Sequence, residues 1–462
     1  MTAHRAFHSV RDSKSRKDTL RIGSGAGFAG DRLEPAVILA ERGGLQYLGL
    51  ECLAERTIAL AQLRKLKEPG EGYDVLLARR MELLLPIIKK KGVRLITNMG
   101  AANPVAAADL IVEIARRRKL DIKVAAVTGD DVLKLMRPTD RVLETGGPLS
   151  AYKWLVSANA YLGVDALLPA LATGADVVIT GRVADPSLFL APAAYEYGWQ
   201  PDDLDRMARG TVMGHLLECA GQITGGYCAD PGRKDIPDFA HIGFPYADVD
   251  SDGNCIIGKP ADTGGAINLI TAKEQLLYEV TDPHAYVTPD SIADFTTVKL
   301  KQTGANRVAV SGATGKPRSP TLKVSIGYHA GYVGEGEISY AGANALKRAQ
   351  LAGEVVRTRL KGAFAEMRVD YIGSTSLHGK SYDEAARPYE VRLRVAARAA
   401  TREKAALVGE EVEALWTNGP GGGGGARKYV HEQVGVISGL IAREKVRSEV
   451  TVREWRREKE TV

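Results

Sequence analysis

The chain has 462 residues, of which 45% are hydrophobic and 26% are charged, and its net charge is +6. This length predicts two or three domains with ample apolar surface to bury. The basic residues are dispersed, and no apolar run approaches the ~20 residues of a membrane helix. We therefore expect neither a nucleic-acid-binding nor a membrane-spanning protein.

The first 18 residues are polar and basic and contain no apolar core. We expect residues 1–18 to be a disordered tail and not a secretory signal. The four cysteines lack the spacing of a zinc site, and the eight histidines are scattered. The sequence therefore predicts no metal site, reduced thiols and a cytoplasmic location.

A glycine-rich turn follows the first predicted strand, residues 19–22. Gly25, Gly27 and Gly30 have the G-x-G-x-x-G spacing, and Glu51 follows about one βαβ step later. This pattern predicts a turn that binds a nicotinamide dinucleotide or a CoA phosphate through backbone N–H groups. The alternative is a tight βα turn with no ligand.

Four further short apolar runs read as strands of a parallel sheet, since each ends in a polar or glycine-containing turn and helical segments separate them. They comprise residues 46–50, 93–97, 123–127 and 177–179. We expect an α/β domain over residues 19–225, with an open, doubly wound sheet favoured over a closed barrel. Ligands of such sheets bind beyond the carboxyl ends of the strands.

Polar residues follow two of these strands directly. Asn98 and Asn103 come after the strand at 93–97, and Arg182 and Asp185 after that at 177–179. We expect Asp185 to act as an acid or base, Arg182 to hold an anion, and the two asparagines to orient the substrate. The alternative for Asp185 is a cap on the helix that Pro186 begins.

A helical segment then brings together His215, Glu218 and Cys219. Glu218 is a second candidate base. His215 and Cys219 are four residues apart and so share a helix face, which allows a Cys–His nucleophile pair; reduced, unreactive cysteine is the alternative.

The second half of the chain mixes strand and helix patterns, which predicts an α+β domain over residues 226–447. Lys259 and Thr263 lie in a glycine-containing loop that could neutralise a carboxylate or phosphate, although a solvated lysine is the alternative. Helices are expected over 342–367, 403–415 and 429–441. Residues 448–462 are expected to form a charged, helical tail.

Five consecutive glycines lie between two of these helical patterns. They follow Asn418, begin with Gly421 and Gly422, and precede Arg427. Successive backbone amides can curl around an anion, and an arginine adds a permanent charge, so we expect an anion-binding loop. A flexible linker is the alternative.

Six segments rich in glycine, aspartate and asparagine stand out: GRVADPSLFLAPAAYEYGW, TNMGAANPVAAADL, GHLLECAGQITGGY, KPADTGGAI, LLYEVTDPHAYVTPD and TNGPGGGGGAR. Together they resemble the acyclic terpene utilisation protein A (AtuA) family, from about Arg21 to about Arg447. The resemblance implies a place in pathways that degrade acyclic terpenes through CoA thioesters. It also implies a core without the family's small C-terminal module, and hence a separate small subunit as partner.

The expected function is a lyase or hydratase reaction on a branched acyl substrate, present as a carboxylate or a CoA thioester, by acid–base catalysis. The chain lacks a G-x-S-x-G elbow, which disfavours serine-hydrolase chemistry. Two alternatives stay open: a nicotinamide-dependent oxidoreductase that uses Gly25–Gly30, and a non-catalytic large subunit. A homo-oligomer is expected in each case.

Overall fold

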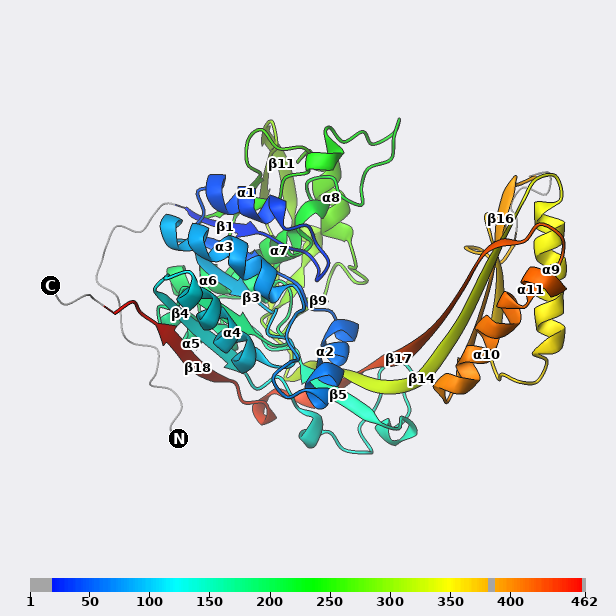
Figure 1. Ribbon diagram of the computed structural model, residues 1–462. Coiled ribbons are helices and arrows are strands. Elements are labelled where there is room, and N and C mark those ends of the chain that lie inside the picture. The colour runs from blue at the N-terminus through cyan, green and yellow to red at the C-terminus, as the bar shows by residue number, and fades with distance from the viewer. Residues whose placement is uncertain (1–18, 381–386, 459–462) are drawn as a thin grey trace. The chain divides into compact units, whose positions relative to one another are not determined.

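The computed structural model of the chain describes residues 19–380 and 387–458, which form two compact units (Figure 1). Of the described residues, the first unit comprises 19–151, Val156–Ile326 and 436–458, and the second comprises Tyr152–Leu155, 327–380 and 387–435. The boundary expected near residue 225 thus falls inside the first unit. The tail expected at residues 1–18 lies outside the described residues.

A ten-stranded sheet runs through the first unit in the order β11-β12-β8-β7-β1-β2-β3-β6-β4-β18. Its five neighbouring parallel strands are β1 (Leu20–Ser24), β2 (Tyr47–Leu50), β3 (Arg94–Thr97), β6 (Val177–Thr180) and β4 (Ile122–Thr128). The antiparallel flanks are β7 (Tyr246–Val249), β8 (Cys255–Gly258), β12 (Arg307–Ser311) and β11 (Lys299–Gly304) on one side and β18 (Glu449–Trp455) on the other. The predicted α/β class with a mostly parallel N-terminal sheet is confirmed.

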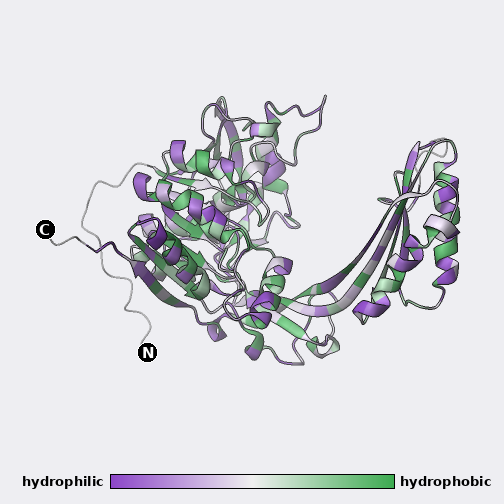
Figure 2. Ribbon diagram, in the orientation of Figure 1, coloured by the Kyte–Doolittle hydropathy of each residue, from purple (hydrophilic) through white to green (hydrophobic). Residues whose placement is uncertain are grey.

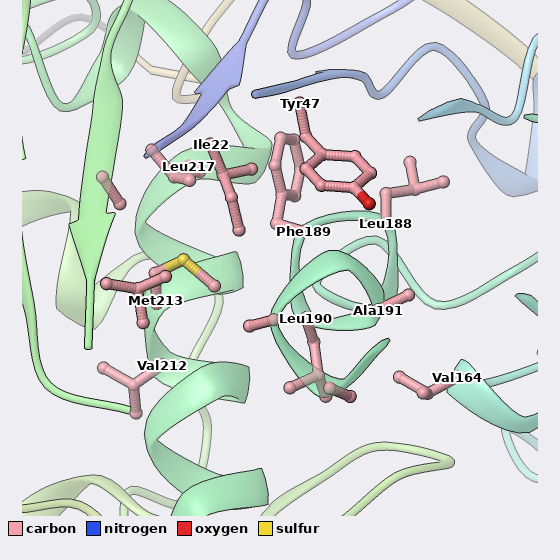
Figure 3. Packing of buried hydrophobic residues seen from close by; sticks show 14 of the residues in the cluster. Ile22, Tyr47, Val164, Leu188, Phe189, Leu190, Ala191, Val212, Met213 and Leu217 are labelled. Carbon is pink, nitrogen blue, oxygen red and sulfur yellow. The ribbon is translucent and has the colours of Figure 1, made fainter. Parts of the chain in front are cut away.

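Helices cover both faces of the parallel strands. On one face, α1 (Glu34–Arg42), α3 (Leu77–Lys91) and α4 (Pro104–Arg117) pack on Leu48, Leu95 and Val177. On the other, α5 (Val164–Ala172), α6 (Ser187–Tyr197) and α7 (Leu204–Glu218) pack on Ile22, Tyr47 and Val178 (Figure 3). Adjacent strand residues such as Tyr47 and Leu48 point to opposite faces, so every position of β2 and β6 and most positions of β1, β3 and β4 are buried. This is why the strands read as unbroken apolar runs.

The helices that follow two neighbouring strands, β3 and β6, lie on opposite faces of the sheet. The chain leaves β3 through α4 and leaves β6 through α6, which lie on opposite faces of the sheet. The carboxyl ends of β3 and β6 therefore form a topological switch point, the place where open α/β sheets bind ligands.

The first unit contains further helices and strands outside the ten-stranded sheet and its covering helices. They comprise α2 (Glu55–Lys67), β5 (Leu155–Ala160), α8 (Leu269–Leu277), and a three-stranded sheet of β13 (Thr314–Lys316), β10 (Ile292–Asp294) and β9 (Tyr286–Val287). Strands β7 and β8 pair as an antiparallel hairpin around a turn at residues 251–254.

The second unit has the chain order β14 (Thr321–Ala341), α9 (Ala345–Arg359), β15 (Met367–Ile372), β16 (Glu390–Ala399), α10 (Arg402–Glu413), α11 (Leu415–Asn418) and β17 (Gly424–Ala442). Its sheet order is β15-β16-β14-β17. This is the βαββαβ arrangement of ferredoxin-like domains. Helices α9 and α10 bury apolar residues against the sheet, and α9 carries both hydrophobic and hydrophilic residues, as an amphipathic helix does (Figure 2).

Two helix predictions near the C-terminal end are wrong. Residues 429–441 lie in strand β17, although Val430, Val434, Ile437 and Ile441 recur at helical spacing. The strand passes from the second unit to the first after Gly435, so its buried positions do not keep the period of two that marks a single sheet face. The tail expected to be helical contains β18, whose pairing with β4 overrides its charged composition.

Candidate functional site

The carboxyl ends of β2 and β3 present a coupled pair of buried polar side chains. Glu51 is 7% exposed, and its Oε1 accepts hydrogen bonds from Asn98 Nδ2 and from the N–H of Leu53, both at 2.9 Å. Asn98 Oδ1 in turn accepts from the N–H of Cys52 at 2.7 Å. Burial and the charge of Asp185 raise the pKa of Glu51 well above its ordinary value, and Arg182 opposes that rise.

Arg182 follows β6 and is almost completely buried. Its guanidinium donates to the carbonyl oxygens of Leu53 and Val183 and forms an ion pair with Asp185. Most of its N–H groups are therefore bound within the protein. Arg182 holds Asp185 in place and ties together the turns that follow β2 and β6.

Asp185 is the most accessible carboxylate of this group, with a side chain that is 38% exposed. Burial of its surroundings raises its pKa, the Arg182 charge lowers it, and the Glu55 charge raises it further. The sequence predicted Asp185 as an acid or base next to Arg182, and the structure places both at the switch point.

Three residues that the sequence did not single out surround this pair. Tyr161 follows β5, and the Arg182 guanidinium and the Lys323 ammonium lie 4.6 Å and 4.9 Å from the centre of its ring. Its hydroxyl donates to Glu55 Oε1 at 2.5 Å, which Lys323 Nζ also approaches at 3.1 Å. Burial alone would raise the pKa of Glu55, but these partners lower it to about 2.

Asp130, two residues after β4, fixes the backbone of the Arg182 turn. Its Oδ2 accepts from the N–H of Arg182 and from Asn159 Nδ2, both at 2.9 Å. Burial raises its pKa to about 6 against these two hydrogen bonds. A β-carbon at Gly181 would lie 2.5 Å from Asp130 Oδ1, so this contact requires glycine there.

The last turn of α7 adds a buried carboxyl–imidazole pair. His215 Nδ1 lies 2.7 Å from Glu218 Oε1 and 3.4 Å from the hydroxyl oxygen of Tyr286. Burial raises the pKa of Glu218 to about 7, His215 lowers it, and the charges of Asp185 and Glu279 raise it. The imidazole is thus engaged by Glu218 and not by Cys219, whose thiol pKa is raised by burial. Glu51, Asp185 and Glu218 together are called the carboxylate cluster below.

Two glycines allow backbone segments of this site to touch. A β-carbon at Gly27 would lie 2.4 Å from the carbonyl carbon of Cys219, and one at Gly214 would lie 2.4 Å from the carbonyl oxygen of Pro186. The glycine-rich turn therefore packs against the end of α7, and α7 packs against the turn that carries Asp185. Side chains at these two positions would force the segments apart.

The predicted dinucleotide turn has contacts within the protein at each of its proposed binding residues. The N–H of Gly27 donates to Asp31 Oδ2 at 2.9 Å, so a carboxylate of the turn itself takes the place of an anionic ligand. Gly25 packs against Leu50 and Gly30 against Phe28, and Glu51 belongs to the carboxylate cluster. Binding of a dinucleotide stays a prediction.

The remaining predicted residues have local partners. Asn103 Nδ2 donates to the carbonyl oxygens of Pro69 and Glu71, and Lys259 Nζ to that of Thr263 at 2.6 Å. In the second unit, Asn418 is the last residue of α11, and its Nδ2 donates to the carbonyl oxygen of Ala414 at 3.1 Å. Gly421 accepts from Arg348, a β-carbon at Gly422 would contact the same guanidinium, and Arg427 is exposed on β17.

The described residues include no group of three or more His, Cys, Asp and Glu side chains arranged to hold a metal ion. None of the helices within the described ranges is long and apolar enough to cross a membrane. The switch point presents carboxyl groups with raised pKa values beside a fixed arginine.

Comparison with known proteins bears on this site. The sequence model of the acyclic terpene utilisation family protein AtuA matches residues 20–452. The chain belongs to the AtuA family. No curated protein and no solved structure matched it in the same comparisons. Membership in the AtuA family associates the chain with acyclic terpene utilisation, and the match spans the carboxylate cluster and both units.

Because the pKa of Glu218 is raised, we expect the stability of this AtuA family protein to depend on pH. The folded state holds the Glu218 proton up to about pH 7, whereas the unfolded chain releases it near 4.5. The unfolded state then binds fewer protons between these pH values, so the free energy of unfolding must fall as the pH rises through this window. In denaturant titrations, the stability of the wild type relative to Glu218→Gln should fall from pH 4.5 to 7 and then level off.

The control is Glu68→Gln, which changes an exposed glutamate in the same way. Its stability should stay parallel to that of the wild type across the window. If the difference in unfolding free energy between the wild type and Glu218→Gln stays constant from pH 4.5 to 7, the raised pKa does not belong to Glu218.

Proposed function

We propose that this protein catalyses a lyase or hydratase step on a branched acyl substrate, carried as a carboxylate or a CoA thioester, in the breakdown of acyclic terpenes. The observation that carries the proposal is the carboxylate cluster at the switch point. Its members lie within electrostatic reach of one another, Asp185 is paired with a fixed arginine, and Glu218 has a pKa of about 7. A protonated and an ionised carboxyl group in one site provide an acid and a base at neutral pH.

The role proposed for each residue of the site follows from the exposure of its side chain and from its partners. Asp185, accessible and ion-paired, takes a proton from the carbon next to the substrate carbonyl. Glu218 gives its proton to the leaving hydroxyl group, which departs as water while the carbon–carbon double bond forms; the reverse sequence is hydration. Arg182 and Lys323 supply positive charge near the developing enolate.

The test is solvent isotope exchange. The purified chain is incubated in D₂O with branched acyl-CoA thioesters and the matching free acids, in saturated, 3-hydroxy and 2,3-unsaturated forms, and products are analysed by mass spectrometry. We expect deuterium at the carbon next to the carbonyl and interconversion of the hydroxy and unsaturated forms. If no substrate takes up deuterium and no substrate is interconverted, the proposal is wrong.

Two other outcomes identify the alternatives. Turnover that requires a nicotinamide dinucleotide would indicate an oxidoreductase. Turnover that appears only after a small family subunit is added would indicate that this chain is one part of a two-subunit enzyme. Activity of the chain alone would show that the subunit is not required.

A further inference from the structure

A groove separates α1 from α3 on one helix-covered face of the first unit, beside the glycine-rich turn (Figure 1). It contains an open cavity of about 640 Å³. The side chains that line it are apolar at Leu33, Val37, Leu76 and Leu83 and charged at Asp31, Arg32, Glu34 and Arg79. The proposed function uses none of these residues.

Three large apolar side chains at or next to this groove are exposed to solvent. They are Phe28, Val75 and Leu83, with exposed fractions of 60%, 72% and 43%. Leu83 lines the groove, and Val75 directly precedes Leu76, which also lines it. The Phe28 ring would contact a β-carbon at Gly30, a further lining residue. An exposed apolar patch among charged residues marks an interaction site, so we expect another surface to cover the groove.

The neighbouring seam on the same face, between α3 and α4, has a different character. Glu82 of α3 forms ion pairs with Arg117 at 3.1 Å and with Arg118 at 2.6 Å, at the end of α4. Charges that are paired within one chain suit a surface in contact with water. The contrast identifies the α1–α3 groove as the part of this face that is built for a partner.

The charges that flank the groove differ in sign between the two helices. Glu34, Val37 and Glu41 are at positions i, i+3 and i+7 of α1 and therefore share one side of that helix. Arg79 of α3 lines the cavity together with Glu34. The side chains of Glu34, Glu41 and Arg79 are exposed, and none of them forms an ion pair within residues 19–380 and 387–458.

A surface with both signs of charge around an apolar centre can pair with itself. We propose that a second copy of this chain covers the groove, in an isologous dimer whose two-fold axis runs along the groove. This axis places α1 of each copy against α3 of the other, so Glu34 meets Arg79 across the interface and the apolar residues meet at its centre. An axis across the groove would place α1 against α1 and oppose like charges. Arg32, the other cation of the groove, already donates to the carbonyl oxygen of Ala240 at 2.7 Å.

The proposed interface reaches the candidate site through the glycine-rich turn. Gly30 and Asp31 line the groove, while Gly27 of the same turn packs against the backbone of Cys219. Cys219 directly follows Glu218 of the carboxylate cluster. The partner copy therefore covers the outer side of a turn whose inner side supports the site, although the dimer does not depend on the proposed function.

Sedimentation equilibrium of the full chain, from nanomolar to high micromolar concentrations, tests the proposal by charge reversal. We expect the wild type to dimerise, and we expect Arg79→Glu and Glu34→Arg each to weaken the dimer at least about tenfold, because each opposes like charges. The double variant restores opposite charges and should return the dimer Kd to within about threefold of the wild type. A chain that is monomeric throughout, or a double variant as weak as the single ones, would overturn the proposal.

Two leucine variants and hydrogen exchange locate the interface. Leu83→Asp introduces a charge into the groove and should abolish the dimer, whereas Leu66→Asp makes the same change at a 64% exposed leucine of α2 and should leave it intact. Amides of residues 28–32 should exchange more slowly in the dimer than in the monomer, and those of α4 should not change. Equal effects of the two leucine variants, or unchanged exchange at residues 28–32, would overturn the assignment to this groove.

Discussion

The Asp185→Asn variant is expected to fold like the wild type and to turn over the acyl substrate about a thousandfold more slowly. An amide cannot accept a proton from carbon, yet its oxygen can still accept a hydrogen bond from Arg182. The Asp185 side chain is 38% exposed, but the Arg182 guanidinium that loses its partner is buried, so the free energy of unfolding should fall by about 1.5–3 kcal/mol. The kcat and the denaturation midpoint are measured on the same preparation.

The matched control is Asp131→Asn. Asp131 is an exposed aspartate after β4, so this variant makes the same chemical change outside the cluster. It should retain full activity. An Asp185→Asn variant with at least a tenth of wild-type kcat would remove Asp185 from the role of base, whichever substrate is used.

The Arg182→Met variant is expected to lose about 3–5 kcal/mol of unfolding free energy. Methionine fills much of the same volume but leaves the carbonyl oxygens of Leu53 and Val183 without the donors that Arg182 supplies, and leaves Asp185 without its partner. Arg182→Lys should lose less, because it keeps the charge but not the fork of N–H groups. Urea denaturation followed by circular dichroism measures both.

A double variant tests why Arg182→Met loses stability. If the loss comes partly from a carboxylate left unpaired, Arg182→Met with Asp185→Asn should be more stable than Arg182→Met alone. Arg21→Met serves as control, because Arg21 is also paired with an aspartate, Asp248, but its side chain is 30% exposed. A loss below about 1 kcal/mol in Arg182→Met would show that the buried guanidinium does not hold the site together.

The sequence located the strands of the parallel sheet and the polar residues that follow them, because short β-branched runs with polar ends are a local pattern. Asn98, Arg182 and Asp185 were found in this way, and they lie together. Glu51 was also singled out, but as part of a cofactor-binding pattern, because its distance from the glycine-rich turn suggested a nucleotide site. The structure gives it Asn98 as a partner instead.

Other members of the site had no local signal. Tyr161 and Lys323 meet Glu55 only because β5 and β14 bring them there from distant parts of the chain. His215 was noticed for its spacing from Cys219, whereas the contact it makes, with Glu218, has an equally helical spacing. Spacing alone could not choose between these two partners; burial and packing of α7 decide it.

The pairing of β18 with β4 has a consequence for how the protein is made. β4 is complete when residue 128 has been synthesised, but its outer neighbour is complete only at residue 455. At 5–20 residues per second, the ribosome needs roughly 15–65 s to cover that interval. During this time the edge of β4, with its run of apolar residues, stays open to pairing with other chains. Chaperone binding to nascent chains should therefore be concentrated on this edge, and truncation before residue 449 should promote aggregation even though the whole switch point is already present.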